Sequence, residues 1–161
     1  LDNGHFHPTE SVGDKISSIL LFADELLLHL TRGVRWDSDH VATFNDEIVL
    51  IAQEIVRAKA LKRVNIGLDY FDASLNRIGA YVVGARAVQQ AFMFALLEPL
   101  KTLVKMEEEG KTFERLAMLE LLKMKPFGAV YDYYCLKNNV PAGLDYIDEI
   151  VKYEKDVLLK R

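Results

Sequence analysis

The sequence predicts an α/β protein built on a parallel sheet. Strand-like segments alternate with helical ones: the former are 1–8, 26–31 and 64–70, and the latter are 9–24, 46–59 and 75–97. This alternation is typical of parallel strands that are joined by crossover helices. Half of the 161 residues are hydrophobic and 27% are charged, which is the composition of a globular domain.

The first elements follow from turn residues and apolar spacing. Gly4 and Pro8 indicate the end of a strand that runs into a turn. Apolar residues at helical spacing then predict a helix over 9–24. The apolar run 26–31 fits either the end of that helix or a buried strand. Because Arg32 and Gly33 end it quickly, we favour a strand.

The middle of the chain carries clearer signals. Residues 34–40 alternate, so we expect an extended segment with Trp36 in the core. Asn45 is a suitable N-cap for a helix over 46–59. The buried stripe that we expect on this helix is Ile48, Ile51, Ala52 and Ile55. Alternation over 64–70 predicts a strand whose apolar face is Val64, Ile66 and Leu68.

After Asp72 the pattern is helical. We expect a long helix over 75–97, a break at Pro99, a solvated hinge at 107–110, and helices at 112–123, 126–138 and 144–159. Three strand–helix units are too few to close an eight-stranded barrel. Since the chain also begins without a lead-in, we expect it to be the C-terminal part of something larger, or to pair with the missing part.

Composition and charge exclude several classes of protein. A net charge of −4 argues against nucleic-acid binding, which needs a concentrated basic face. No apolar run approaches the roughly 20 residues of a membrane helix, and the N-terminus does not resemble a signal peptide. Cys135 is the only cysteine, so no intrachain disulfide can form. We therefore expect a cytoplasmic protein without nucleic-acid or membrane partners.

Ionisable residues gather where the predicted strands end. All four histidines lie within the first 40 residues, and the candidates at strand ends or in the following segment are Asp2, His5, His29, Asp37, Asp39 and Asp69. The carboxyl ends of parallel strands form the functional face of such sheets. Structural alternatives exist: Asp2 or Asp69 could cap a helix, His29 could be a hydrogen-bonded core histidine, and a D-x-D pair such as Asp37 and Asp39 is common on solvated loops.

Asp37 and Asp39 form the sharpest pair. Two residues apart in an extended chain, their Cα atoms would be roughly 6–7 Å apart on one face. Their carboxylates could then converge on one cation. Oxygen ligands with imidazole favour manganese, magnesium, cobalt or zinc. The absence of a nearby cysteine argues against a zinc site with thiolate ligands.

Several motifs carry a family resemblance. Residues 35–40, RWDSDH, look like the Trp–Asp–x–Asp loop of the xylose isomerase group of metal-dependent sugar isomerases. Together with GHFHPTE at 4–10, IGLDYFDAS at 66–74 and ALLEP at 95–99, they resemble the L-rhamnose isomerase family. The similarity covers essentially the whole chain and corresponds to the C-terminal portion of that enzyme.

The resemblance implies the C-terminal part of a (β/α)8 TIM barrel followed by a helical C-terminal extension. The last βα units would be residues 1–98, and the extension 99–161. It further implies a bacterial-type cytosolic homotetramer that converts L-rhamnose to L-rhamnulose. The enzyme would hold a catalytic manganese and a second divalent ion, zinc, manganese or cobalt.

The resemblance also assigns ligands. His5, Asp37 and Asp39 match the catalytic metal site, and Asp2, His29 and Asp69 match the second site; the catalytic residues expected from it are His5, Asp37, Asp39 and Asp69. A glutamate that completes the second site and an active-site lysine lie upstream of this sequence in the family, so the segment alone would be incomplete.

The resemblance also implies the mechanism, a hydride shift between C2 and C1, and we expect a metal-bound water to move the proton between O1 and O2. Two alternatives remain open. A sugar epimerase of the same barrel superfamily would also use acids and histidine on a metal, but would form no ketose. The apolar, helix-rich latter half could instead indicate a non-catalytic assembly module.

Overall fold

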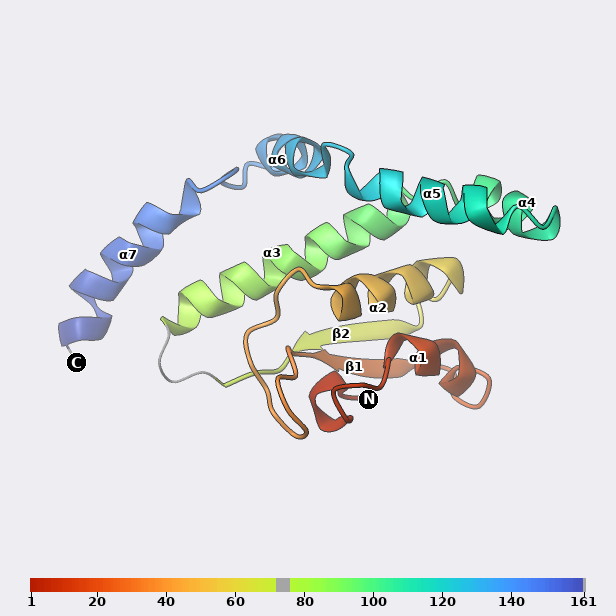
Figure 1. Cartoon of the computed structure of the whole chain (residues 1–161). Coiled ribbons are helices and arrows are strands. Elements are labelled where there is room, and N and C mark those ends of the chain that lie inside the picture. The colour runs from red at the N-terminus through yellow and green to blue at the C-terminus, as the bar shows by residue number, and fades with distance from the viewer. Residues whose placement is uncertain (72–75, 161) are drawn as a thin grey trace.

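The computed structural model describes residues 1–71 and 76–160, and combines a small parallel sheet with a layer of helices (Figure 1). The elements in chain order are the 3-10 helix η1 (Asn3–His5), α1 (Gly13–Ile19), β1 (Leu26–Leu30), α2 (Asp46–Arg57), β2 (Val64–Leu68), α3 (Arg77–Leu96), α4 (Leu100–Glu108), α5 (Thr112–Lys123), α6 (Phe127–Lys137), α7 (Tyr146–Asp156) and the 3-10 helix η2 (Leu158–Lys160).

The sheet is parallel, as predicted. β1 pairs with β2 in a register that runs from Leu26 opposite Val64 to Leu30 opposite Leu68. Asp2 forms a single parallel bridge with His29, so the N-terminal segment also lies beside β1. Three chain segments therefore reach the same edge of the sheet with their carboxyl ends.

Two early elements differ from the sequence prediction. The helix expected over 9–24 is only Gly13–Ile19, and the first strand is reduced to the bridge at Asp2. The strand favoured over 26–31 is confirmed as β1. The N-terminal strand is short because the chain turns into η1 directly after Asp2.

The segment 34–40 is not extended, and this prediction is wrong. It forms a turn in which Asp37 has a φ of 53°, and Trp36 is 67% exposed rather than in the core. The Ser38 hydroxyl causes the turn: it accepts hydrogen bonds from the N–H groups of Val34 and Arg35 and donates to the Arg35 carbonyl. Such local side-chain bonds compete with extended backbone.

Helix α2 confirms the prediction from its cap and its apolar stripe. The Asn45 side chain accepts a hydrogen bond from the Ile48 N–H, and Ile48, Ile51, Ala52 and Ile55 are all buried. Helix α3 begins after Asn76, whose side chain accepts from the Gly79 N–H. Its predicted start at Leu75 lies outside the described residues.

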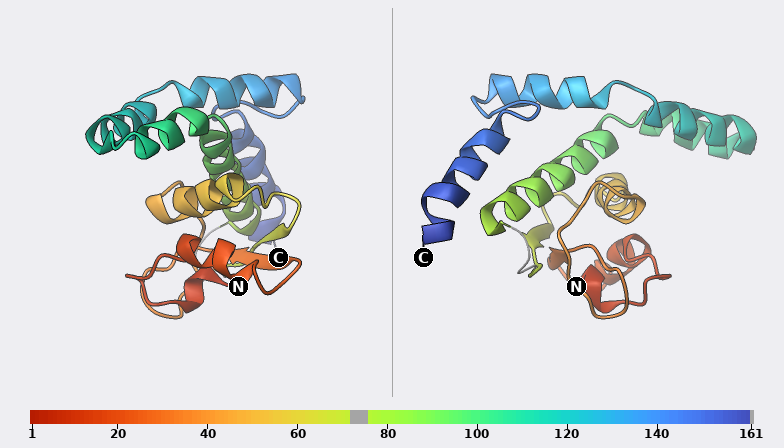
Figure 2. Two further views of the ribbon diagram at one scale, coloured as in Figure 1. Left: turned by 90° about the vertical axis from the view of Figure 1, so that its right-hand side faces the viewer. Right: turned by 60° about the vertical axis from the view of Figure 1, so that its left-hand side comes forward.

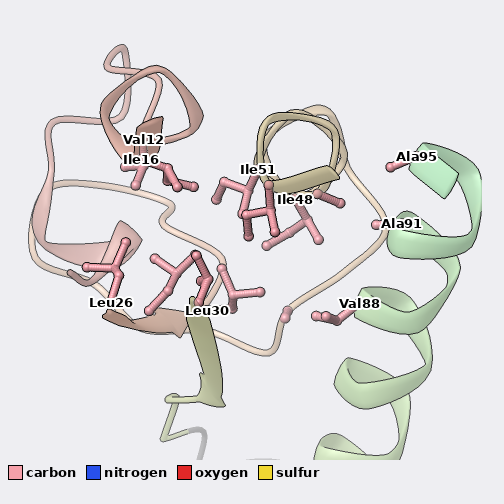
Figure 3. Packing of buried hydrophobic residues seen from close by; sticks show 14 of the residues in the cluster. Val12, Ile16, Leu26, Leu30, Ile48, Ile51, Val88, Ala91 and Ala95 are labelled. Atoms are coloured by element: carbon pink, nitrogen blue, oxygen red, sulfur yellow. The ribbon is translucent and has the colours of Figure 1, made fainter. Parts of the chain in front are cut away.

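The core lies between β1, α1 and α2, and α3 lies beside α2 on the side away from α1 (Figure 3). Leu28 and Leu30 of β1 are fully buried together with Ile16 of α1 and Ile51 of α2. The predicted apolar face of β2 is only partly covered: Ile66 remains 37% exposed. In the described part of the chain, no strand other than β1 pairs with β2, so its far edge is open.

The C-terminal helices arch over the α/β part (Figure 2). α3 ends at Leu96 and α4 begins after Pro99, which confirms the predicted break. Arg86 of α3 fixes the returning helices, because its guanidinium lies over the rings of Tyr131 (5.1 Å) and Tyr146 (4.6 Å). No single helix among the described residues is long and apolar enough to cross a membrane; α3 and α4 pass that test only as a pair bent by 53°.

A buried ion pair joins the end of α2 to the link between α3 and α4. Glu98, in the link between α3 and α4, accepts from Arg57 through both oxygens, at 2.8 and 2.6 Å, and from Gln53 at 2.9 Å. The Glu98 side chain is 2% exposed and that of Arg57 is 30% exposed. The carboxylate is thus removed from water but fully hydrogen-bonded.

We expect Glu98→Ala in the full-length protein to lower the free energy of unfolding by about 3 kcal/mol, because it leaves Arg57 and Gln53 without their shared acceptor. Urea unfolding measures the change. The matched control is Glu120→Ala, which breaks the exposed pair with Lys123 and should change stability by less than about 1 kcal/mol. Equal effects of the two substitutions would contradict the stabilising role that we assign to the buried Glu98 carboxylate.

Candidate metal centre

Predicted ligands from distant parts of the sequence meet at the carboxyl edge of the sheet. Asp2, His5 and Asp39 each offer a ligand atom within 4.8 Å of the others, and Asp2, His29 and Asp69 form a second group by the same measure. Asp2 belongs to both groups. Of the six predicted ligands, only Asp37 is outside them.

The local structure around Asp2 explains how one carboxylate faces two groups. Its Oδ1 caps η1 by accepting a hydrogen bond of 2.8 Å from the Gly4 N–H. This bond orients Oδ2, which lies 3.3 Å from His29 Nδ1 and 3.8 Å from His5 Nε2. The helix-capping role considered for Asp2 therefore occurs together with its place in the site.

Sheet register builds the group that contains His29. His29 pairs with Asp2 on one side and with Gly67 on the other, and Asp69 follows β2 so that its Oδ2 lies 2.9 Å from His29 Nδ1. Gly67 leaves room for the imidazole, since a Cβ there would lie 3.3 Å from His29 Cδ2. The His29 side chain is 39% exposed, so it is not a core histidine.

The group that contains His5 is more open. Asp37 Oδ1 lies 3.7 Å from His5 Nε2, but the Asp37 side chain is 78% exposed and points from the turn rather than from an extended strand. Asp39 is half-buried, and its Oδ1 has no hydrogen-bond partner. Burial raises the pKa of Asp39, as does the nearby Asp2 carboxylate, while His5 opposes the shift.

These residues fit a divalent cation. Carboxylate oxygens and imidazole nitrogens are the donors that manganese, magnesium, cobalt or zinc accept in proteins. The buried, unpartnered Asp39 Oδ1 is an atom that lacks a partner among the protein groups, and a cation would supply one. The surplus of carboxylates over imidazoles also favours a positive ion.

Three buried polar residues that support the site were not predicted. Ser38 shapes the turn, Thr31 donates from its hydroxyl to the His40 carbonyl at 2.8 Å, and Asn3 binds the Thr31 backbone. Each lies next to a predicted ligand, or within two residues of one, in the sequence. Their closeness to predicted ligands was the only signal in the sequence that could have identified these three residues. Polar residues are frequent in loops, however, and the sequence pattern does not show that these three are buried.

Comparison with known proteins gives a consistent result. The family model described as L-rhamnose isomerase matches residues 1–161. The chain belongs to the L-rhamnose isomerase family. It is 59% identical over 161 residues to L-rhamnose isomerase of Bacteroides thetaiotaomicron, and 53% identical over the same length to those of Rhodopirellula baltica and Listeria innocua. The resemblance inferred from the sequence motifs is thereby confirmed.

The match covers 100% of this chain but only 38% of each of these relatives. The chain thus spans well under half of the length of the family enzymes that it matches. The structure accordingly holds a small parallel sheet with helices, consistent with a portion of such an isomerase.

We expect Gly4→Ala to disturb the site. A Cβ at this position would overlap Asp39 Oδ1 and lie 2.7 Å from Thr31 Cγ2. The resulting shift should destabilise the full-length protein by about 1–3 kcal/mol. Gly33→Ala is the control, since a Cβ there has no neighbour closer than 4.0 Å. Thermal unfolding of both variants checks this, and a Gly4→Ala protein as stable as Gly33→Ala would refute it.

The raised pKa of Asp39 predicts a pH effect in chelator-treated, full-length protein. Since folding disfavours the carboxylate form, Asp39 supports stability below its ordinary pKa of about 3.9, and this support is lost as pH rises through the higher folded value. Asp39→Asn should therefore raise the unfolding temperature at pH 7 but not near pH 3.

Thermal scans across this pH range test the prediction. Asp24→Asn makes the same chemical change at an exposed residue before the start of β1, at the other end of that strand from the site, and is the control. A stabilisation by Asp39→Asn that is equally large at pH 3 would show that the charge of Asp39 is not its cause.

Proposed function

We propose that the enzyme of which this chain forms part interconverts L-rhamnose and L-rhamnulose, and that the chain contributes ligands for two divalent cations. The observation that carries the proposal is the meeting of Asp2, His5 and Asp39, and of Asp2, His29 and Asp69, at one edge of the sheet. Membership of the L-rhamnose isomerase family supports the substrate and the reaction type.

The two groups would hold cations of the manganese, cobalt or zinc class, with manganese at the group containing His5 and Asp39. Bound there, such ions polarise a carbonyl and the neighbouring hydroxyl of an open-chain sugar. In the reaction a hydride passes from C2 to C1 and a proton passes from O2 to O1. Asp37, exposed beside His5, is available as a further ligand or as an acceptor for a sugar hydroxyl.

The protein groups of this chain fix the geometry. Asp2 is oriented by its bond to the Gly4 N–H, and His29 is held between the carboxylates of Asp2 and Asp69. A side chain held in place before substrate binds loses less entropy in the reaction. This preorganisation is the contribution that we assign to the edge of the sheet.

We further propose the architecture of the whole enzyme. Residues 1–98 would be the last βα units of a (β/α)8 barrel, and 99–161 a helical extension that supports a homotetramer. The open far edge of β2 is suited to pairing with another barrel strand. A cytoplasmic location fits a sugar-metabolising enzyme of this kind.

We expect Asp37→Asn in the full-length enzyme to lower turnover of L-rhamnose and affinity for manganese, each by at least about tenfold, because one negative charge beside His5 is lost. Ketose formation and calorimetric titration of metal-free enzyme measure the two effects. Removal of divalent ions should abolish activity in the native enzyme, and added manganese should restore it.

Asp148→Asn on α7 makes the same chemical change at an exposed residue that belongs to neither ligand group, and should leave both measurements unaltered. Full activity in metal-depleted buffer would overturn the proposal. Conversion of L-rhamnose to an epimeric aldose would point to an epimerase, and a full-length protein that binds no divalent ion would point to an assembly module.

A further inference from the structure

We infer that Asn3 is a positioning residue for the cation ligands: its carboxamide replaces a peptide group of the N-terminal strand, which frees the backbone to turn and carry His5 to Asp2 and Asp39. The inference deepens the proposed function and rests on it. Its basis is a set of contacts between the Asn3 side chain and the backbone at the end of β1.

The N-terminal segment begins as a regular parallel neighbour of β1. The Leu1 ammonium donates to the Leu27 carbonyl at 2.9 Å, and the His29 N–H donates to the Leu1 carbonyl at 2.8 Å. Asp2 then forms the bridge with His29. In a parallel ladder, the next bonds would run from the Thr31 N–H to the carbonyl of residue 3 and from the N–H of residue 5 to the Thr31 carbonyl.

The side chain of Asn3 makes these bonds instead of the backbone. Its Oδ1 accepts from the Thr31 N–H at 2.8 Å, and its Nδ2 donates to the Thr31 carbonyl at 2.9 Å. The backbone N–H and carbonyl of Thr31 are therefore both hydrogen-bonded, although Thr31 is fully buried and Asn3 is only 8% exposed. A carboxamide has the donor and the acceptor of a peptide group, so no other neutral side chain of this length could do the same.

Because its backbone is released from the ladder, the chain can form η1 at Asn3–His5. That turn brings the Gly4 N–H to Asp2 Oδ1 and the His5 imidazole to 3.8 Å from Asp2 Oδ2. Had the strand continued, residue 5 would have stayed alongside the end of β1. The early end of the N-terminal strand is thus a condition for the group Asp2, His5 and Asp39.

Thr31 connects Asn3 to the segment that carries Asp39. Its hydroxyl donates to the His40 carbonyl, and Arg32 forms an antiparallel bridge with His40. His40 follows Asp39 directly. Asn3 therefore braces both segments that bring ligands to the cation, one through its own turn and the other through Thr31, without being a ligand itself.

The test uses metal-free, full-length enzyme and titrates it with Mn²⁺ by calorimetry. Asn3→Ala removes both bonds, and we expect affinity for Mn²⁺ to fall about 10–100-fold, the range found when groups that orient metal ligands are removed. The matched control is Gln53→Ala, which deletes another buried amide (7% exposed) that is bonded to Glu98 rather than to the site. It should lower the unfolding temperature while changing Mn²⁺ affinity less than twofold.

Asn3→Asp separates positioning from charge and keeps the size of the side chain. An added carboxylate near the site would tighten cation binding if only charge mattered. We expect weaker binding instead, because Asp cannot donate to the Thr31 carbonyl when ionised. Unchanged or tighter Mn²⁺ binding in Asn3→Asp, or an Asn3→Ala enzyme that binds Mn²⁺ like Gln53→Ala, would overturn the inference. Native enzyme that binds no cation would instead refute the proposed function and the inference together.

Discussion

The pairing of the N-terminal segment with β1 is the constraint on which the site depends. Asp2 and His29 are 27 positions apart, and the parallel bridge places them side by side at the edge of the sheet. The register between β1 and β2 then sets Gly67 beside His29 and lets Asp69 follow at the end of the next strand. A shift of one residue in either pairing would turn these side chains to the opposite face.

The topology was predictable because it follows from rules that do not require loop detail. Alternating strands and helices indicated a parallel sheet, and parallel strands end at one edge, so Asp2, His5, His29 and Asp69 were expected to gather there. Asp39 also arrives, but by another route than the extended segment that we expected. Its position depends on hydrogen bonds of Ser38 within the turn and of Thr31 with His40.

Segment 34–40 and strand β2 differ from their predicted form for a common physical reason. Alternation in 34–40 indicated a strand with Trp36 in the core, yet a single hydroxyl, that of Ser38, satisfies enough backbone groups to form a turn. Likewise, alternation placed Ile66 on the apolar face of its strand, yet Ile66 is 37% exposed in a sheet that has two strands in the described part of the chain. Periodicity indicates which side chains favour burial. It does not show the hydrogen bonds within a turn, or the neighbouring strands, that decide whether a segment is extended and its side chains are covered.

The membership of Asp2 in both ligand groups has a consequence for protein engineering. Because Asp2 belongs to both ligand groups, a substitution at position 2 would alter both of the proposed cation sites at once. If the proposed function holds, the ion preference of one site could be redesigned separately through the ligands that the two groups do not share, His5 and Asp39 in one and His29 and Asp69 in the other. Libraries aimed at a new metal selectivity in one of the proposed sites should therefore leave this position fixed.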